Sequence, residues 1–279
     1  MQERIDREKR EARYWFDSLA ELAKYLDGTE PTWRSRDSRT IGPSRAWDLQ
    51  AGYDEAWKLA RFGWIEGAER AGQALKALPP LTPAPVNRVD FYGHLPHVPR
   101  FCAGAPDNMI RRAYDPNQGT GAVLTLIVPV NALGSVETQH MANFGLGVAQ
   151  YVNQMETNGV RVEVIGAICS RVSGWRVAHC WTVKRADQPL DLAVLAFAIG
   201  HPAMFRRLGF ALREHCAAPA DPGYGRPIDV HVNDAINAPT GSIVLNGMRH
   251  ADSIATTPAK AGEYITKQID AALDKRDAA

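Results

Sequence analysis

The sequence lacks the features that define several broad classes of protein. It has only four cysteines and no Cys-x-x-Cys pair, so neither a disulfide framework nor a zinc knuckle is expected to organise the fold. Residues 1–13 are dense in charge, which predicts neither a signal peptide nor a membrane anchor there. The apolar run at 190–200 is interrupted by Asp191 and is too short to cross a bilayer. We therefore expect a protein of the cytoplasm without membrane contact.

An excess of charge is lacking as well. Lys and Arg number 32 against 31 Asp and Glu, which leaves a formal net charge of +1. This balance argues against a protein held to nucleic acid mainly by its overall positive potential. By contrast, a hydrophobic fraction of 45% in a chain of 279 residues is ample for a sizeable core. Any basic surface should then be confined to local patches.

The first 78 residues are predicted to form a helical module. Apolar residues recur at helical spacing from Arg4 to Leu26, and small apolar residues form a second stripe from Asp54 to Leu78. Between them, the segment 33–45 contains Pro and Gly and is predicted to be a basic loop. Four prolines in residues 79–85 mark a boundary. Residues 79–121 are accordingly predicted to be a proline-rich linker and extended, irregular arm.

Residues 122–279 are predicted to form an α/β domain. The patterns favour strands at 122–130, 160–167, 175–183 and 242–245, and helices at 136–157, 204–215 and 258–273. The segment 190–198 fits either a strand or a buried helix. The order of elements predicts a three-layer α/β sandwich, in which helices cover both faces of one sheet.

The turn after the first of these strands, residues 131–135, lies where α/β sheets bind ligands. The order of elements resembles a von Willebrand factor A-type domain, a family in which this turn carries an Asp-x-Ser-x-Ser magnesium motif. Asn131 stands at the Asp position and Leu133 at the first Ser, so only Ser135 matches. A hard cation requires charged oxygen ligands. The resemblance therefore implies a degenerate site without metal, and we expect no cofactor.

Four phrases along the chain are similar to an uncharacterised bacteriophage protein family. They lie at residues 53–60, 63–67, 98–109 and 201–207. The resemblance implies expression inside an infected or lysogenic bacterium, and so a location in the host cytoplasm. Whether the protein also enters the virion is left open. We also expect the paired arginines of the last phrase to meet Glu66 or Asp107 and to brace the two domains.

Basic residues are the best candidates for a binding surface. They lie in the predicted loop, in the arm and in a later helix: Arg34, Arg36, Arg39, Arg100, Arg111, Arg112, Arg206 and Arg207. An arginine fork can bind a phosphate or a carboxylate of a partner protein. The same residues therefore serve two different hypotheses about function.

The first hypothesis is a non-enzymatic bacteriophage protein that acts through protein–protein interaction or assembly. Its partner would be a phage or host protein, and oligomerisation is left open. The alternative is a nucleic-acid-binding protein of phage replication or packaging that uses the arginines. An enzyme with a site dispersed over His, Asp and Glu also stays open, because spacing arguments do not detect such sites.

Overall fold

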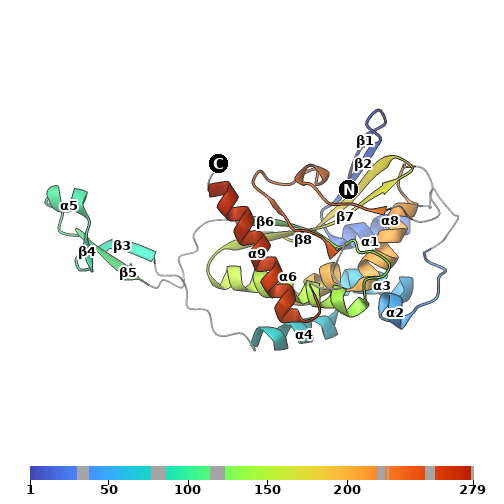
Figure 1. The fold of residues 1–279 in the computed structure, drawn as a ribbon, viewed down its shortest axis with the longest axis horizontal. Coiled ribbons are helices and arrows are strands. Elements are labelled where there is room, and N and C mark those ends of the chain that lie inside the picture. The colour runs from blue at the N-terminus through green and yellow to red at the C-terminus, as the bar shows by residue number, and fades with distance from the viewer. Residues whose placement is uncertain are drawn as a thin grey trace.

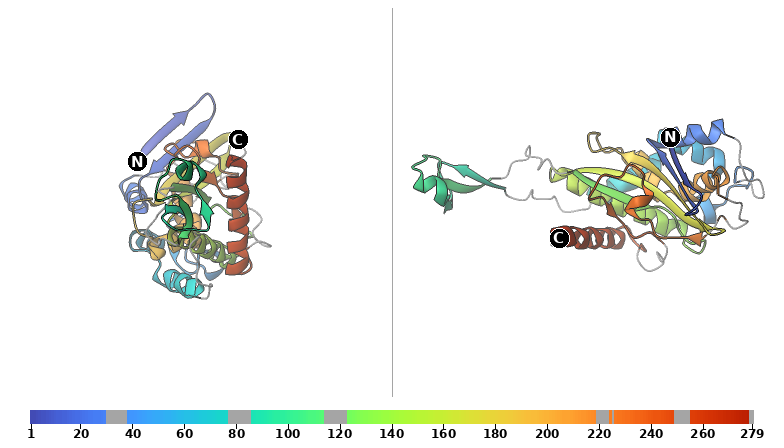
Figure 2. Two further views of the ribbon diagram at one scale, coloured as in Figure 1. Left: turned by 90° about the vertical axis from the view of Figure 1, so that its left-hand side faces the viewer. Right: turned by 90° about the horizontal axis from the view of Figure 1, so that it is seen from above.

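A computed structural model describes residues 1–29, 38–76, 86–113, 123–218, 224, 226–248 and 255–277. Within these ranges the chain forms a large mixed α/β unit and a small lobe at residues 86–113 (Figures 1 and 2). The α/β class expected from the sequence is confirmed. None of the helices in these ranges is long and apolar enough to cross a membrane.

A mixed, 7-stranded sheet forms the centre of the large unit, with the order β1-β2-β8-β7-β6-β10 and with β9 paired to β7. Strand β6, next to the edge strand β10, is parallel to β7 and β10, whereas β7 and β8 form an antiparallel hairpin. Every residue of β6 after Val123 is buried, as its continuous apolar sequence predicts. The strands are β1 (Gln2–Asp6), β2 (Glu11–Phe16), β6 (Val123–Pro129), β7 (Arg161–Val172), β8 (Trp175–Lys184), β9 (Arg226–Pro227) and β10 (Ile243–Val244).

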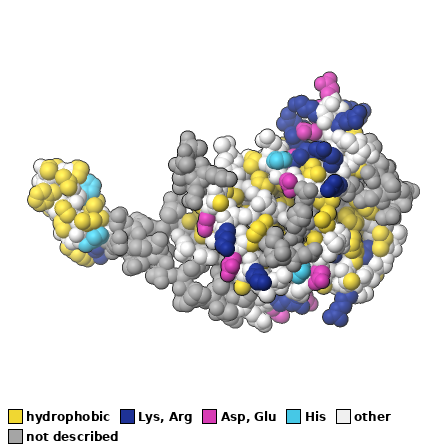
Figure 3. All heavy atoms as spheres, viewed as in Figure 1, with side chains coloured by type: hydrophobic (Ala, Val, Ile, Leu, Met, Phe, Trp, Pro, Cys, Tyr) yellow, Lys and Arg dark blue, Asp and Glu magenta, His cyan; other side chains and the backbone are white. Residues whose placement is uncertain are grey.

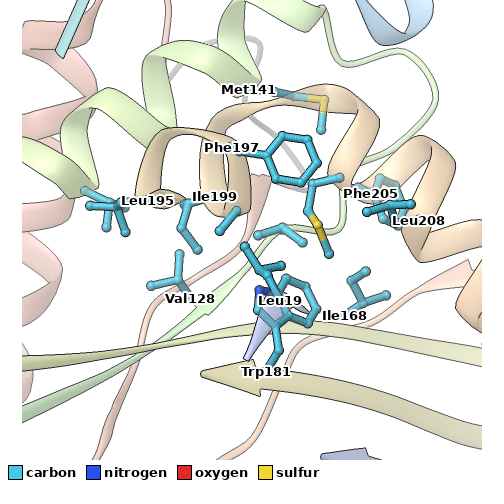
Figure 4. Packing of buried hydrophobic residues seen from close by; sticks show 14 of the residues in the cluster. Leu19, Val128, Met141, Ile168, Trp181, Leu195, Phe197, Ile199, Phe205 and Leu208 are labelled. Carbon is cyan, nitrogen blue, oxygen red and sulfur yellow. The ribbon is translucent and has the colours of Figure 1, made fainter. Parts of the chain in front are cut away.

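Helices cover one face of this sheet. Val128, Ile168 and Trp181 point from the strands into a cluster with Phe197 and Leu208 (Figure 4). The helical elements of the large unit are α1 (Leu19–Gly28), α2 (Arg45–Asp48), α3 (Gly52–Phe62), α4 (Ile65–Lys76), α6 (Thr138–Thr157), α7 (Leu192–Leu195), α8 (Phe210–Glu214) and α9 (Pro258–Asp277), with the π-helical η1 (Ala196–Gly200) and η2 (Met204–Gly209).

The sequence of segment 190–198 fits either a strand or a helix, and the structure shows a helix from Leu192 onwards. Asp191 caps its start, because its carboxylate accepts hydrogen bonds from the main-chain N–H groups of Ala193 (2.9 Å) and Val194 (3.1 Å). Its continuation η1 packs closely on α6. A Cβ atom at Gly145 would lie 2.3 Å from the Cα atom of Gly200, so this crossing requires glycine.

The other face of the sheet has no layer of long helices in the ranges described, which corrects the expected three-layer sandwich. A second apolar cluster around Ile165, Cys169 and Cys180 lies there, and residues from 228–244 pack on it. Before β10, this segment is a loop with one 3-10 turn, η3 (Val232–Asp234). The extended chain packs against these strands in place of a helical layer.

The helix predicted from Arg4 to Leu26 is wrong over its first half. A hairpin of β1 and β2 occupies residues 2–16, and α1 begins only at Leu19. Ala12, Tyr14 and Phe16 point into the main core while Trp15 points to the opposite face, which is the alternation of a strand. Ser18 then begins the helix, because its hydroxyl accepts a hydrogen bond from the Glu21 N–H (3.1 Å).

The second predicted helix, Asp54 to Leu78, is divided into α3 and α4 at Gly63. This residue has φ +79°, and a Cβ atom there would lie 2.6 Å from that of Ala193. Helices α1, α3 and α4 contribute to the same hydrophobic cluster as β6 and α9. The described helices before residue 77 therefore share one core with the sheet and do not form a separate helical module.

The lobe replaces the irregular arm expected between residues 86 and 113. Its strands β3 (Val86–Asp90), β4 (Leu95–Pro96) and β5 (Met109–Ala113) form an antiparallel sheet, joined by the short helix α5 (Val98–Cys102). Gly93 makes the tight crossing possible, because a Cβ atom there would lie 2.2 Å from the carbonyl oxygen of Ile110.

Arg206 and Arg207 do not meet Glu66 or Asp107, so the expected interdomain brace is wrong. Both side chains are buried and hold the segment 38–48 instead. Arg207 forms a buried ion pair with Asp48 and donates to the carbonyl oxygens of Ile41 (2.8 Å) and Gly42 (2.7 Å).

Replacing Asp48 by Asn should strongly destabilise the fold. The variant leaves the Arg207 guanidinium buried without its counter-charge, which costs about 3–5 kcal/mol in the free energy of unfolding. Urea denaturation measures this loss. The matched control is Glu55→Gln, since Glu55 pairs with Lys58 on the surface and its loss should cost less than about 1 kcal/mol. Equal losses in the two variants would contradict this assignment.

The stability of the protein should fall in mild acid because His201 is buried in its neutral form. Its Nδ1 accepts a hydrogen bond from the Ala203 N–H (3.1 Å), and burial lowers its pKa to about 4. The unfolded chain, with a histidine pKa near 6.5, binds the proton first. Stability is then lost as pH falls from about 6.5 towards 4, by up to about 1.4 kcal/mol per pH unit.

His201→Asn should reduce this pH dependence, since an amide oxygen still accepts from the Ala203 N–H but binds no proton. Urea denaturation of both proteins at several pH values provides the comparison. The same slope in the variant and the original chain would show that His201 is not responsible.

Candidate functional site

A pocket of about 190 Å³ lies at the carboxyl end of β6, on the helical face of the sheet. Its floor comes from the turn at residues 131–134 and from residues 168–170 of β7, and its wall comes from Phe205, Phe210 and Arg213. This is the edge at which α/β sheets bind ligands, because the connections after parallel strands diverge there. Its position agrees with the edge favoured by the sequence.

Two polar groups that line this pocket are a neutral imidazole and a guanidinium. The ring of His179 stacks on Tyr14 with 4.8 Å between centroids, and its burial, together with the positive charge of Arg213, lowers its pKa to about 3. Arg213 donates to the Cys216 sulfur (2.7 Å). Phe210 and Tyr224 stack at 4.3 Å beside them. The combination suits a small ligand with an apolar body and a hydrogen-bonding end.

The thiol at the pocket edge is unsuited to nucleophilic attack. Burial raises the pKa of Cys169, and the nearby Asp234 carboxylate raises it further. A thiol with such a pKa stays protonated near neutral pH, and the thiolate is the nucleophilic form. The pocket therefore offers contacts for binding rather than an activated cysteine.

The side chain of Asn131 links two main-chain segments at this edge. Its side-chain amide donates to the carbonyl oxygen of Ile228 (3.3 Å), and its Oδ1 accepts from the Cys169 N–H (3.4 Å). Ser135, the other residue of the degenerate metal motif, is exposed. Throughout the described ranges, no three His, Cys, Asp or Glu side chains are grouped so that they could hold a metal ion.

The eight candidate arginines do not form one surface. Arg34 and Arg36 lie outside the residues that the structure describes, and so does the side chain of Arg112 in β5. Arg39 donates to the carbonyl oxygen of Leu26 (2.8 Å) and lies 5.7 Å from the centre of the Tyr53 ring. Its guanidinium therefore already has protein partners.

The other four are divided between the lobe and the core. In the lobe, Arg100 pairs with Asp107 (2.5 Å) and Arg111 with Asp90 (3.1 Å). In the core, Arg206 donates to the carbonyl oxygens of Trp47 (2.9 Å) and Val136 (2.5 Å), and Arg207 pairs with Asp48. The core pair is thus inaccessible to a phosphate or to a partner protein.

The second face of the sheet carries a charged cluster that sequence reasoning missed. Asp234, only 2% exposed, accepts hydrogen bonds from Arg176 Nε (2.9 Å) and Nη2 (2.6 Å) and from the His231 N–H (2.8 Å). Burial acts to raise the pKa of Asp234, but these donors outweigh it and hold that pKa below its usual range. The carboxylate is therefore charged and fully engaged.

One signal in the sequence predicts part of this cluster. Ser173-Gly174 is a two-residue hairpin turn, and both residues have positive φ (47° and 80°). Such a turn places Val172 opposite Trp175 and hence Arg171 opposite Arg176, as the structure shows. Asp234 arrives from a loop far along the chain, and no local pattern indicates its position.

Comparison with known proteins gives one family. The family described as "Domain of unknown function (DUF7192)" matches residues 4–274, nearly the whole chain. No curated protein and no solved structure matches the chain.

One thiol per chain should react with a thiol reagent such as DTNB while the protein is folded. Of the four free cysteines, Cys102 in the lobe is exposed and the other three are buried. Burial raises the pKa of Cys180 and Cys216, which suppresses the reactive thiolate. Absorbance at saturation counts the thiols. Cys102→Ser should remove the fast reaction, and urea should expose the remaining three; rapid labelling of the variant without urea would be inconsistent with the core.

Proposed function

The chain belongs to the DUF7192 family, and we propose that it is a non-enzymatic protein that binds another protein through the lobe at residues 86–113. The observation that carries the proposal is the lobe's exposed apolar surface. The partner is a phage or host protein, in keeping with the assembly role expected from the sequence.

The lobe exposes large apolar side chains that a folded monomer usually covers. Phe91 is 70% exposed and Phe101 63%, and Tyr92, Leu95 and Val98 are each more than half exposed. Figure 3 shows hydrophobic side chains over much of the visible face of the lobe. Contiguous apolar patches of this kind mark interaction sites, and aromatic side chains are enriched in protein interfaces.

The charges of the lobe favour a protein partner over nucleic acid. Arg100 and Arg111 are each paired with an aspartate of the same lobe. Phosphate binding would have to break these pairs, whereas an apolar protein surface leaves them intact at the rim of the contact. With these two arginines paired, the exposed apolar side chains are the main feature that the described part of the lobe offers to a partner.

The proposal extends to the finer family features expected from the sequence. A von Willebrand A-like arrangement of the large unit is supported by the order β6, α6, β7, β8, helices, β10 and α9, which is the order on which the resemblance rests. A bacteriophage context is supported by the phrases at 98–109 and 201–207, the first of which forms much of the lobe. A location in the host cytoplasm follows from that context.

The double variant Phe91→Ser, Phe101→Ser should lose the protein partner. Truncating two aromatic anchors of an interface weakens binding by about tenfold or more. The tagged full chain and the variant are compared by quantitative affinity capture from infected cells, with half of each sample treated with nuclease. The matched control is Phe62→Ser, since Phe62 is 72% exposed but lies at the end of α3.

Partners that survive nuclease and disappear only in the lobe variant would support the proposal. Equal recovery with the lobe variant and with the original chain would contradict it. Partners lost on nuclease treatment would instead favour the alternative of a nucleic-acid-binding protein of replication or packaging.

A further inference from the structure

Three arginines lie side by side on the second face of the sheet. Arg171 of β7 is directly opposite Arg176 of β8 and also directly opposite Arg226 of β9. Side chains at directly opposed positions point to the same face, with Cβ atoms about 5 Å apart. Like charges in this arrangement repel one another, so the fold keeps an unfavourable row of cations unless something compensates it.

The protein compensates only Arg176, at one end of this row. Arg176 is held by Asp234 and also donates to the carbonyl oxygen of Asp229 (2.9 Å). Glu11 lies opposite Arg176 on β2, but its carboxylate pairs with Arg13 (2.8 Å). Arg171 and Arg226 are exposed, and in the part of the chain that the structure describes neither has an ion pair or a side-chain hydrogen bond.

These side chains line a cleft of about 600 Å³, together with Ile228, Asp229 and His231. Asp229 is the one carboxylate among the lining residues, so the wall has an excess of positive charge. The cleft adjoins the carboxyl end of β7, beside the β7–β8 turn. Figure 3 shows Lys and Arg side chains gathered near this end of the molecule, around the β1–β2 hairpin.

We propose that this cleft binds a phosphate group between Arg171 and Arg226, with Arg176 and its partner Asp234 as the rigid floor. Arginine forks match tetrahedral phosphate oxygens and form charge-assisted hydrogen bonds with them. The bound anion would also relieve the repulsion between the two uncompensated guanidinium groups. The site is separate from the lobe, so its ligand and the protein partner of the lobe are tested independently.

The test titrates the full chain with inorganic pyrophosphate at about 0.1 M ionic strength, where the Debye length is about 10 Å, and measures the heat of binding. Arg171→Gln and Arg226→Gln should each weaken binding about tenfold or more, because each removes a charge-assisted contact. The matched control is Arg161→Gln, the same charge change at the exposed amino end of the same strand, which should leave the affinity within about twofold, since an exposed charge more than a Debye length away is screened.

A thermal measurement separates ligand binding from a merely structural role. Pyrophosphate should raise the melting temperature of the original chain and of Arg161→Gln but not that of Arg171→Gln. Without anion, Arg171→Gln should melt no lower than the original chain, because the variant relieves a repulsion. A lower melting temperature with an unchanged response to pyrophosphate would overturn the proposal.

Competition identifies the source of the phosphate. If a single-stranded oligodeoxynucleotide binds and loses affinity in Arg171→Gln and Arg226→Gln, the ligand is a nucleic-acid backbone. If pyrophosphate binds and the oligonucleotide does not displace it, the ligand is a small phosphorylated compound. Absence of saturable binding by both probes, or equal weakening in Arg161→Gln, would refute the site.

Discussion

The buried guanidinium groups of Arg206 and Arg207 impose the constraint on which much of the large unit depends. A buried cation is tolerated only when acceptors surround it. The acceptors are the carboxylate of Asp48 and carbonyl oxygens of the segment 38–48. These contacts fix the position of that segment and of the α2 turn within it.

The same contacts shape the pocket. Arg206 lies 4.2 Å from the centre of the Trp47 ring, and Trp47 lines the pocket at the end of β6. Nearby, Glu214 accepts from the Ser38 N–H (2.8 Å) and from the hydroxyl of Tyr224 (2.6 Å), which attaches this lining residue of the pocket to α8. Core stability and pocket geometry are thus coupled through a few buried charges, and the sheet itself is held by ordinary apolar packing.

The sequence predicted the elements whose patterns are local. The strands near 122–130, 160–167 and 175–183 and the helices near 136–157 and 258–273 are all present, because a continuous apolar run, alternation or a capped amphipathic stripe specifies each one. It failed at residues 4–16, where charged residues between apolar ones fit both periods and pairing with β8 decides for a strand. The site residues were harder still: Arg171 and Arg176 follow from a turn, whereas Asp48 and Asp234 meet their arginines only through the tertiary fold.

The first and last residues of the lobe, Val86 and Ala113, are directly opposite each other in its sheet. Its two connections to the large unit therefore start about 5 Å apart. A segment whose two ends lie close together can be replaced or removed with little change to the rest of the fold, because only a short distance has to be bridged. Natural variation can thus replace the lobe as a unit, while the sheet and its buried charges stay unchanged.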